Sequence, residues 1–236
     1  MKVKEFRYPR PAVATMAQTR TVWRGFWHLV RQRKLLSLGL FAAALLLGAL
    51  VFPHDQAWLR QLHFWPENGE KIARRISWYL GTWGDYPTYN LPLALAFWLY
   101  GVWRKSRKWR RLAVVALLGG TLAGLFDDFF RLTLGRPRPD AGIPDGFYGL
   151  AYAFQGKFES FPSGHAAAVF GAAAALLVTD LPVGIITTLF ALSVVWARME
   201  LYRHYPSDVL IGSAIGIYFG LMTGWGAKAR IRDHGS

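Results

Sequence analysis

Three short clusters of polar residues hold most of the side chains in this sequence that could do chemistry. They occupy residues 131–139, 161–165 and 198–208. Each cluster lies beside the end of an apolar stretch, so each is expected at a helix terminus. Together they offer three well-spaced arginines, two histidines, a carboxylate and a helix start that reads Pro-Ser-Gly-His.

The arginines and the helix start are suited to binding a tetrahedral oxyanion. Arg131, Arg138 and Arg198 each present a permanently charged, planar fork of donors. Ser163 is a favourable N-cap residue, and Gly164 would let an anion approach the free backbone N–H groups of the first turn. We therefore predict that these five residues bind a phosphoryl group.

The two histidines indicate what happens to that phosphoryl group. His204 has Asp208 four residues further along the chain, within reach if the intervening turn is helical. A carboxylate on one ring nitrogen fixes the tautomer and raises the nucleophilicity of the other nitrogen. With His165 as a second acid–base group, the set indicates phosphoryl transfer through a phosphohistidine. A metal site on the same residues is disfavoured because three arginines would repel a cation, and no cofactor is expected.

The clusters are separated by apolar stretches of the length that crosses a membrane. The chain of 236 residues is 53% hydrophobic, and residues 35–52 carry no charge. Eighteen helical residues extend about 27 Å, close to the hydrocarbon thickness of a bilayer. Further apolar stretches follow at residues 88–103, 112–126, 164–179, 181–197 and 209–225. We therefore predict an all-α, polytopic membrane protein with six transmembrane helices, and an interfacial segment rich in tryptophan before the second span.

The basic residues set the predicted orientation. The 28 Lys and Arg exceed the 14 Asp and Glu, and the net charge of +14 would by itself indicate nucleic-acid binding. In a membrane protein the same charge orients the helices. Residues 1–34, residues 104–111 and the residues after Trp225 carry 18 of the 28 and fall on one side of the membrane. We therefore expect both termini in the cytoplasm, the polar clusters on the opposite face, and no nucleic-acid partner.

The sequence divides into a basic cytoplasmic segment at residues 1–34, a single membrane domain at residues 35–226 and a short cytoplasmic tail at residues 227–236. A cleaved signal peptide is not expected, because the 34-residue polar region before the first apolar stretch is too long. The chain contains no cysteine, which excludes a Cys nucleophile, a disulfide and a Cys-ligated metal site.

In residue type and order, the three clusters resemble the signature motifs of the type 2 phosphatidic acid phosphatase (PAP2) family, whose fold is shared with vanadium haloperoxidases. The family pattern is Lys-x6-Arg-Pro, then Pro-Ser-Gly-His, then Ser-Arg-x5-His-x3-Asp. Here Arg131 occupies the lysine position and Ala197 occupies the first serine position of the third motif, while the other positions match. The resemblance extends over about residues 70–226.

The resemblance implies a metal-independent lipid phosphatase. In such an enzyme His204 attacks phosphorus in line, oriented by Asp208, and His165 protonates the leaving group and then serves as base for hydrolysis. The five phosphoryl-binding residues predicted above hold the oxygens and stabilise their charge. Arg131 in place of lysine keeps the positive charge and Ala197 removes one hydroxyl, so neither departure is expected to abolish activity.

Several functions remain open from the sequence. The expected substrate is a long-chain lipid phosphate or diphosphate of a bacterial cytoplasmic membrane, such as undecaprenyl diphosphate, phosphatidylglycerophosphate, phosphatidic acid or lipid A. A lipid-to-lipid phosphotransferase would use the same phosphohistidine and differ only in its acceptor. A non-enzymatic membrane anchor or lipid-binding protein would explain the basic segments, but not an aspartate four residues after His204.

Overall fold

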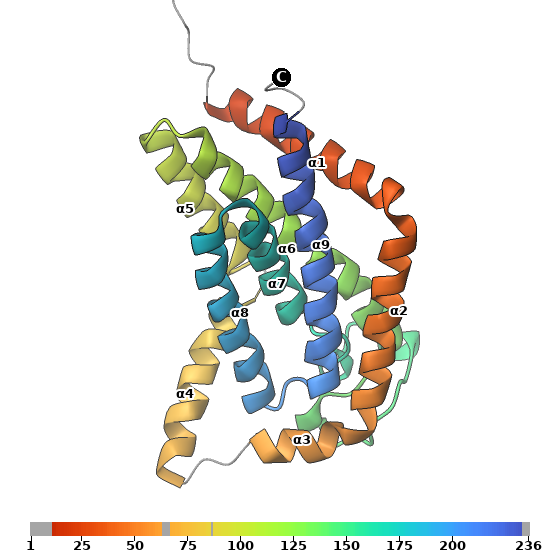
Figure 1. Cartoon of the computed structure of the whole chain (residues 1–236). Helices are drawn as coiled ribbons and strands as arrows, with labels where there is room; N and C mark the ends of the chain where they lie inside the picture. The colour runs from red at the N-terminus through yellow and green to blue at the C-terminus, as the bar shows by residue number, and fades with distance from the viewer. Residues whose placement is uncertain (1–10, 63–66, 86, 233–236) are drawn as a thin grey trace, which may run out of the picture.

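The protein is all-α over the residues that the computed structural model describes, which are 11–62, 67–85 and 87–232. Most of the long helices form one bundle, and α1 lies across one end of it (Figure 1). The α-helices are α1 (Pro11–Gln32), α2 (Lys34–Val51), α3 (Asp55–Leu62), α4 (Glu67–Trp83), α5 (Asn90–Trp103), α6 (Arg107–Leu134), α7 (Gly164–Thr179), α8 (Leu181–Glu200) and α9 (Pro206–Arg232). Short 3-10 turns lie at η1 (Phe52–His54), η2 (Pro139–Ala141), η3 (Leu150–Tyr152) and η4 (Gly156–Phe158).

Within the described residues, four helical runs are long and apolar enough to cross a membrane. They are Lys34–Leu62, Arg107–Leu134, Leu181–Glu200 and Pro206–Lys228. The two other predicted spans form α5 and α7, which are apolar but have only 14 and 16 residues. Such helices rise about 21 and 24 Å, less than the ~30 Å hydrocarbon core. The all-α, polytopic prediction is confirmed with four candidate spans, and the prediction of six is not.

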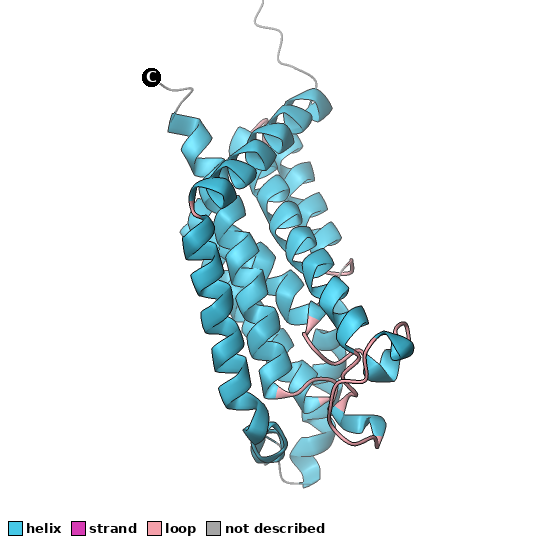
Figure 2. Cartoon of the chain, turned by 90° about the vertical axis from the view of Figure 1, so that its right-hand side faces the viewer, coloured by secondary structure: helices cyan, strands magenta, loops and turns pink. Residues whose placement is uncertain are grey.

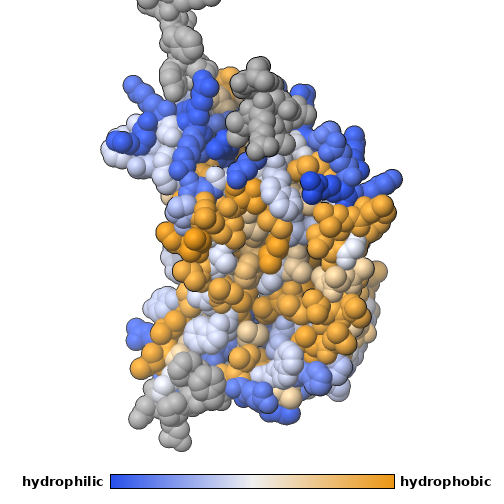
Figure 3. Space-filling model, viewed as in Figure 1, coloured by the Kyte–Doolittle hydropathy of each residue, from blue (hydrophilic) through white to orange (hydrophobic). Residues whose placement is uncertain are grey.

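The surface carries the pattern expected of a bilayer-spanning protein. On the face shown in Figure 3, an apolar band separates hydrophilic side chains at the two ends of the molecule. Leu38, Leu45 and Leu46 of α2 are among the exposed apolar residues. Because exposing such side chains to water is unfavourable, this band is the surface that hydrocarbon would cover.

The segment before the first apolar stretch forms a helix of its own. α1 lies against α9, and the two helices meet where Gly25 faces Gly226. The side chains of Val22 and Phe26 are buried in this contact, whereas Trp23 on the same helix stays exposed. An amphipathic helix of this kind, with basic residues on its outer side, is typical of a membrane interface.

The core is α7, which packs against α6, α8 and α9. Seven of the 16 residues of this helix are alanine, and the helix is buried from Ala166 to Leu176. The glycines that recur every four residues in α9 face it: a Cβ atom on Gly216 would lie 2.5 Å from the carbonyl oxygen of Ala167, and one on Gly220 would lie 2.5 Å from that of Gly171. The glycines therefore form a close-packing stripe, as the sequence predicts. This approach brings the N-termini of α7 and α9 together.

Replacing Gly220 by valine should destabilise the bundle, because the new side chain would enter the space of the Gly171 carbonyl. We expect a loss of about 1–3 kcal/mol of unfolding free energy, measured as a lower thermal unfolding temperature of the detergent-solubilised protein. Gly39→Val in α2 is the matched control, because a Cβ atom there meets no atom of the described residues within 4 Å. Equal unfolding temperatures for the two variants would contradict the packing of α7 against α9.

Candidate active site

The three polar clusters meet where α6 ends and where α7 and α9 begin, at the end of the bundle where the loops gather (Figure 2). α6 stops at Gly135, whose positive φ of 65° is the conformation that glycine adopts at helix ends. Two backbone hydrogen bonds join the two halves of the loop between α6 and α7. Ser160 N–H donates to the Arg136 carbonyl at 3.0 Å, and Arg138 N–H donates to the Lys157 carbonyl at 2.8 Å. These bonds hold the first cluster beside the second.

Five of the predicted site residues line one cavity of about 350 Å³. They are Arg131, Arg138, Gly164, His165 and His204. The two imidazole rings face the cavity with their centroids 6.2 Å apart. The separation leaves room for a phosphoryl group near both rings.

Ser163 caps α7, as predicted. Its Oγ accepts a hydrogen bond from the backbone N–H of Ala166 at 3.4 Å, and its own N–H donates to the Asp208 carbonyl at 3.1 Å. The Ser163 side chain is fully buried, so of the two phosphoryl-binding residues predicted at this helix start it is Gly164 that lines the cavity. The backbone at that position, together with the helix dipole, is the anion-binding feature of this terminus.

The surroundings of His204 fix its tautomer. Its Nδ1 lies 2.7 Å from the Ser160 carbonyl oxygen, which can only accept, so Nδ1 carries the proton and Nε2 keeps a lone pair. The side chain is 2% exposed. Burial, and then the charges of Arg198 and Arg138, lower the pKa of His204 well below its usual value. His204 is therefore held as a neutral imidazole.

Asp208 does not make the direct hydrogen bond to His204 that the sequence predicts, because its Oδ2 lies 3.8 Å from the histidine Nδ1. That oxygen instead accepts from the Ser160 hydroxyl at 2.6 Å and from the Tyr205 N–H at 2.7 Å. The reason is that α9 begins only at Pro206, so His204 and Asp208 do not share a helical turn. Asp208 fixes Ser160, and the Ser160 carbonyl holds His204.

Arg136 has a structural role that the sequence does not predict. It is fully buried and donates to Asp208 at 2.6 Å, to Ser207 at 2.8 Å, to Asp55 at 2.8 Å and to both carboxylate oxygens of Asp145. Burial by itself would lower the pKa of Arg136, but its carboxylate partners raise it above the usual value. The only signal in the sequence is a second Arg-Pro pair inside the first cluster.

Arg131 is not free for substrate in this structure. Its guanidinium pairs with Glu159 and with Asp128, both at 2.7 Å, and these two carboxylates also line the cavity. A bound phosphoryl group would have to share Arg131 with them. The sequence does not predict either ion pair, because neither carboxylate lies at a motif position.

Arg138 and Arg198 are held differently. The Nε of Arg138 donates to the Gly156 carbonyl at 2.7 Å, which anchors the side chain at the cavity wall. Arg198 is only 9% exposed, and its buried Nε has no hydrogen-bond partner among the described residues. A buried donor without a partner is unfavourable, so a bound oxyanion would stabilise this arginine.

His165 faces a carboxylate that the sequence reasoning also missed. Its Nε2 lies 3.5 Å from Asp85, which stands in the turn between α4 and α5 and lines the cavity. Asp85 therefore gives the predicted general acid a charged partner. Within the described part of the chain, no group of three or more His, Cys, Asp or Glu residues is placed to hold a metal ion.

Known proteins resemble this chain in sequence and in fold. The lipid A 1-phosphatases of Rhizobium johnstonii and Rhizobium etli are each 38% identical to it over 104 residues, 43% of this chain. The match covers 42% and 44% of those proteins, so it spans less than half of their length. The crystal structure of a transmembrane PAP2 type phosphatidylglycerolphosphate phosphatase from Bacillus subtilis superposes with a TM-score of 0.53. That likeness has 21% identity and covers 83% of this chain and 96% of the other, and it is a likeness of fold.

The pattern of the PAP2 superfamily matches residues 108–232, a stretch that contains all three polar clusters. This stretch includes α6 from its second residue, the loop that contributes Arg138 and Glu159 to the cavity lining, and α7 to α9. Because the match extends over more than half of the 236 residues, the chain belongs to the PAP2 superfamily.

Proposed function

We propose that this protein is an integral membrane lipid phosphatase that works through a phosphohistidine on His204. The observation that carries the proposal is the hydrogen bond from His204 Nδ1 to the Ser160 carbonyl, because it leaves Nε2 as a neutral nucleophile beside an anion-binding cavity. Family membership and the curated lipid A 1-phosphatase relatives support the same reaction class.

The proposed reaction has two steps. His204 Nε2 attacks phosphorus in line, the bond from phosphorus to the leaving oxygen breaks, and His165 donates a proton to that oxygen. Water then attacks the phosphohistidine with His165 as base, which releases inorganic phosphate and restores His204. Arg138, Arg198 and the Gly164 N–H stabilise the charge on the phosphoryl oxygens.

The substrate class that we propose is a long-chain lipid with a terminal phosphate. The names of the relatives favour the 1-phosphate of lipid A within this class. Leu125 of α6 belongs to the cavity lining and its apolar side chain is 62% exposed, so the cavity adjoins exposed apolar surface that could contact a lipid chain. A panel of lipid A, phosphatidylglycerophosphate, phosphatidic acid and undecaprenyl diphosphate tests the substrate, and added acceptor lipids reveal any phosphotransfer.

We also propose that α5 and α7 complete six spans, with both termini in the cytoplasm and the cavity on the outer face of a bacterial inner membrane. The basic residues support this orientation, because α1 and the Arg104–Arg111 segment lie at the end of the bundle opposite to the cavity (Figure 1). In this arrangement the membrane domain would include residues 35–226.

The orientation can be tested with single cysteines, because the native chain has none. We expect a membrane-impermeant maleimide to label Gln155→Cys, in the loop near the cavity, in intact spheroplasts. Ser106→Cys, between α5 and α6, should be labelled only after permeabilisation. The opposite labelling pattern would contradict the proposed topology.

Substituting the nucleophile should abolish the reaction. In His204→Asn we expect phosphate release from the preferred lipid to fall by at least about 10³-fold, because no other group replaces the attacking nitrogen. The matched control is His28→Asn, which makes the same change on an exposed histidine of α1 and should leave the rate unchanged. A His204→Asn variant with the full rate would exclude the mechanism.

The acidic limb of the pH–rate profile should lie below the pH of about 6.5 at which an ordinary histidine titrates. The lowered pKa of His204 keeps the ring neutral as the pH falls, and activity is lost only when the pH passes through that lowered value. Arg198→Gln removes one of the charges that lower this pKa, so its acidic limb should move to higher pH. Ionisation of the substrate is the same for both proteins, so identical acidic limbs would contradict the assignment.

A further inference from the structure

We propose that Asp55 is a positioning residue for His204, so that the N-terminal helices α2 and α3 take part in the active site. This inference rests on the proposed role of His204 as nucleophile. Asp55 lies outside the 108–232 region that matches the family, and nothing in the three motifs points to it.

Asp55 is buried although the helix that precedes it is not. Only 11% of the most apolar part of the helical run from Lys34 to Leu62 is buried within the protein. Asp55, in contrast, is only 1% exposed. Its Oδ1 accepts the backbone N–H of Ser207 at 2.8 Å. A carboxylate at this place satisfies a free N–H of the first turn of α9 and complements the helix dipole.

The other oxygen of Asp55 reaches the guanidinium that holds Asp208. Its Oδ2 accepts from Arg136 at 2.8 Å and from the Ser207 hydroxyl at 2.5 Å. The Nη1 of Arg136 donates to the same hydroxyl and to Asp208. Asp208 accepts the hydroxyl proton of Ser160, whose carbonyl holds His204. An unbroken series of hydrogen bonds therefore runs from α3 to the nucleophile.

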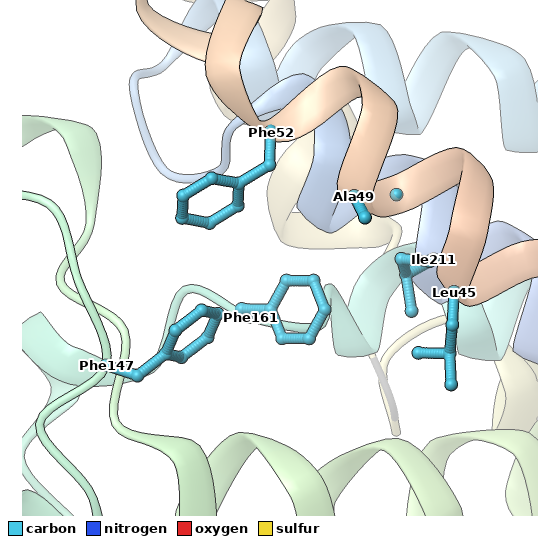
Figure 4. Close-up of a pocket in the computed structure, with 7 residues that line it drawn as sticks. Leu45, Ala49, Phe52, Phe147, Phe161 and Ile211 are labelled. Atoms are coloured by element: carbon cyan, nitrogen blue, oxygen red, sulfur yellow. The ribbon is translucent and has the colours of Figure 1, made fainter.

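The 3-10 turn η1, directly after α2, packs on the same guanidinium. The Cζ atom of Arg136 lies 4.3 Å from the ring centroid of Phe52 and 4.1 Å from that of Tyr205, so the planar group is held between two rings. Phe52 also lines an apolar pocket of about 320 Å³ together with Phe147 and Phe161 (Figure 4). In such apolar surroundings little water competes for the ionic hydrogen bonds, and the position of each partner depends on the others.

Removing the charge of Asp55 would weaken the hydrogen bonds around Arg136 and would also shift the groups that make them. Arg136 would keep Asp145 and Asp208 as charged partners and Ser207 as a neutral one, and the first turn of α9 would lose its carboxylate partner. The Ser160 carbonyl would then hold His204 less firmly. Attack on phosphorus in line depends on sub-ångström alignment, so the loss should fall on the chemical step and not on substrate binding.

The test uses Asp55→Asn in the full-length protein, reconstituted in phospholipid nanodiscs. We expect kcat for lipid phosphate hydrolysis to fall by about 10- to 100-fold while KM changes by less than about threefold. Ser207→Ala keeps the N–H contact and removes only the bridging hydroxyl, so it should lower kcat by a smaller factor. Glu70→Gln is the matched control, because it makes the same chemical change in an exposed ion pair with Arg74.

A second measurement does not depend on turnover. In ¹⁵N-histidine NMR spectra, with the His204 signals assigned by their loss in His204→Gln, the wild type should show a single Nδ1-protonated tautomer. Asp55→Asn should show a mixture. If the wild type hydrolyses none of the lipids but the tautomer still changes, the proposed function fails and the positioning role stands.

Unchanged kcat together with an unchanged His204 spectrum in folded Asp55→Asn would overturn the proposal. A purely structural role would lower the yield of folded protein but leave kcat, KM and the tautomer of the folded fraction unaltered, and that result would overturn it as well. If Asp55→Asn does not fold, Ser207→Ala decides the matter by the same two measurements.

Discussion

The buried guanidinium of Arg136 is the contact on which the rest of the site depends. It joins α3, the loop after α6 and the first turn of α9 through Asp55, Asp145 and Asp208. Removing one partner from a buried ion pair of this kind costs about 3–5 kcal/mol, because the other charge stays in a poorly solvated place. Without it, α3, the loop after α6 and the first turn of α9 would lose the ionic contact that they share.

In this arrangement, different groups set the tautomer and the protonation state of the His204 ring. On the side away from the cavity, Asp208 and Ser160 fix the proton of His204 on Nδ1. Burial and the charges of Arg198 and Arg138 lower the pKa of the ring and keep it neutral, and Arg138 lines the cavity in which an anion would bind. Positive charge therefore keeps the ring unprotonated and also attracts an anionic substrate, and the proposed in-line attack by His204 would use both effects.

The sequence predicts the features that depend on neighbours in the chain. The apolar stretches became α2 and α5 to α9, the glycines of α9 pack closely, and Ser163 caps α7 through a contact three residues away. The sequence does not predict contacts between distant segments. The ion pair of Asp55 with Arg136 joins residues 81 positions apart, and that of Arg131 with Glu159 joins residues 28 positions apart. Helix boundaries account for the other two differences from the sequence predictions. Because α9 begins only at Pro206, Asp208 does not hydrogen-bond directly to His204. Because α5 and α7 are short, six membrane spans are not confirmed.

The central claim is that phosphorus becomes bonded to His204 during turnover. The most direct measurement is a rapid quench with a ³²P-labelled lipid phosphate, followed by alkaline peptide mapping of the labelled protein. We predict an acid-labile, alkali-stable label on the peptide that contains His204, formed faster than inorganic phosphate is released. A label on another residue, or phosphate release with no labelled protein at any time, would contradict the account.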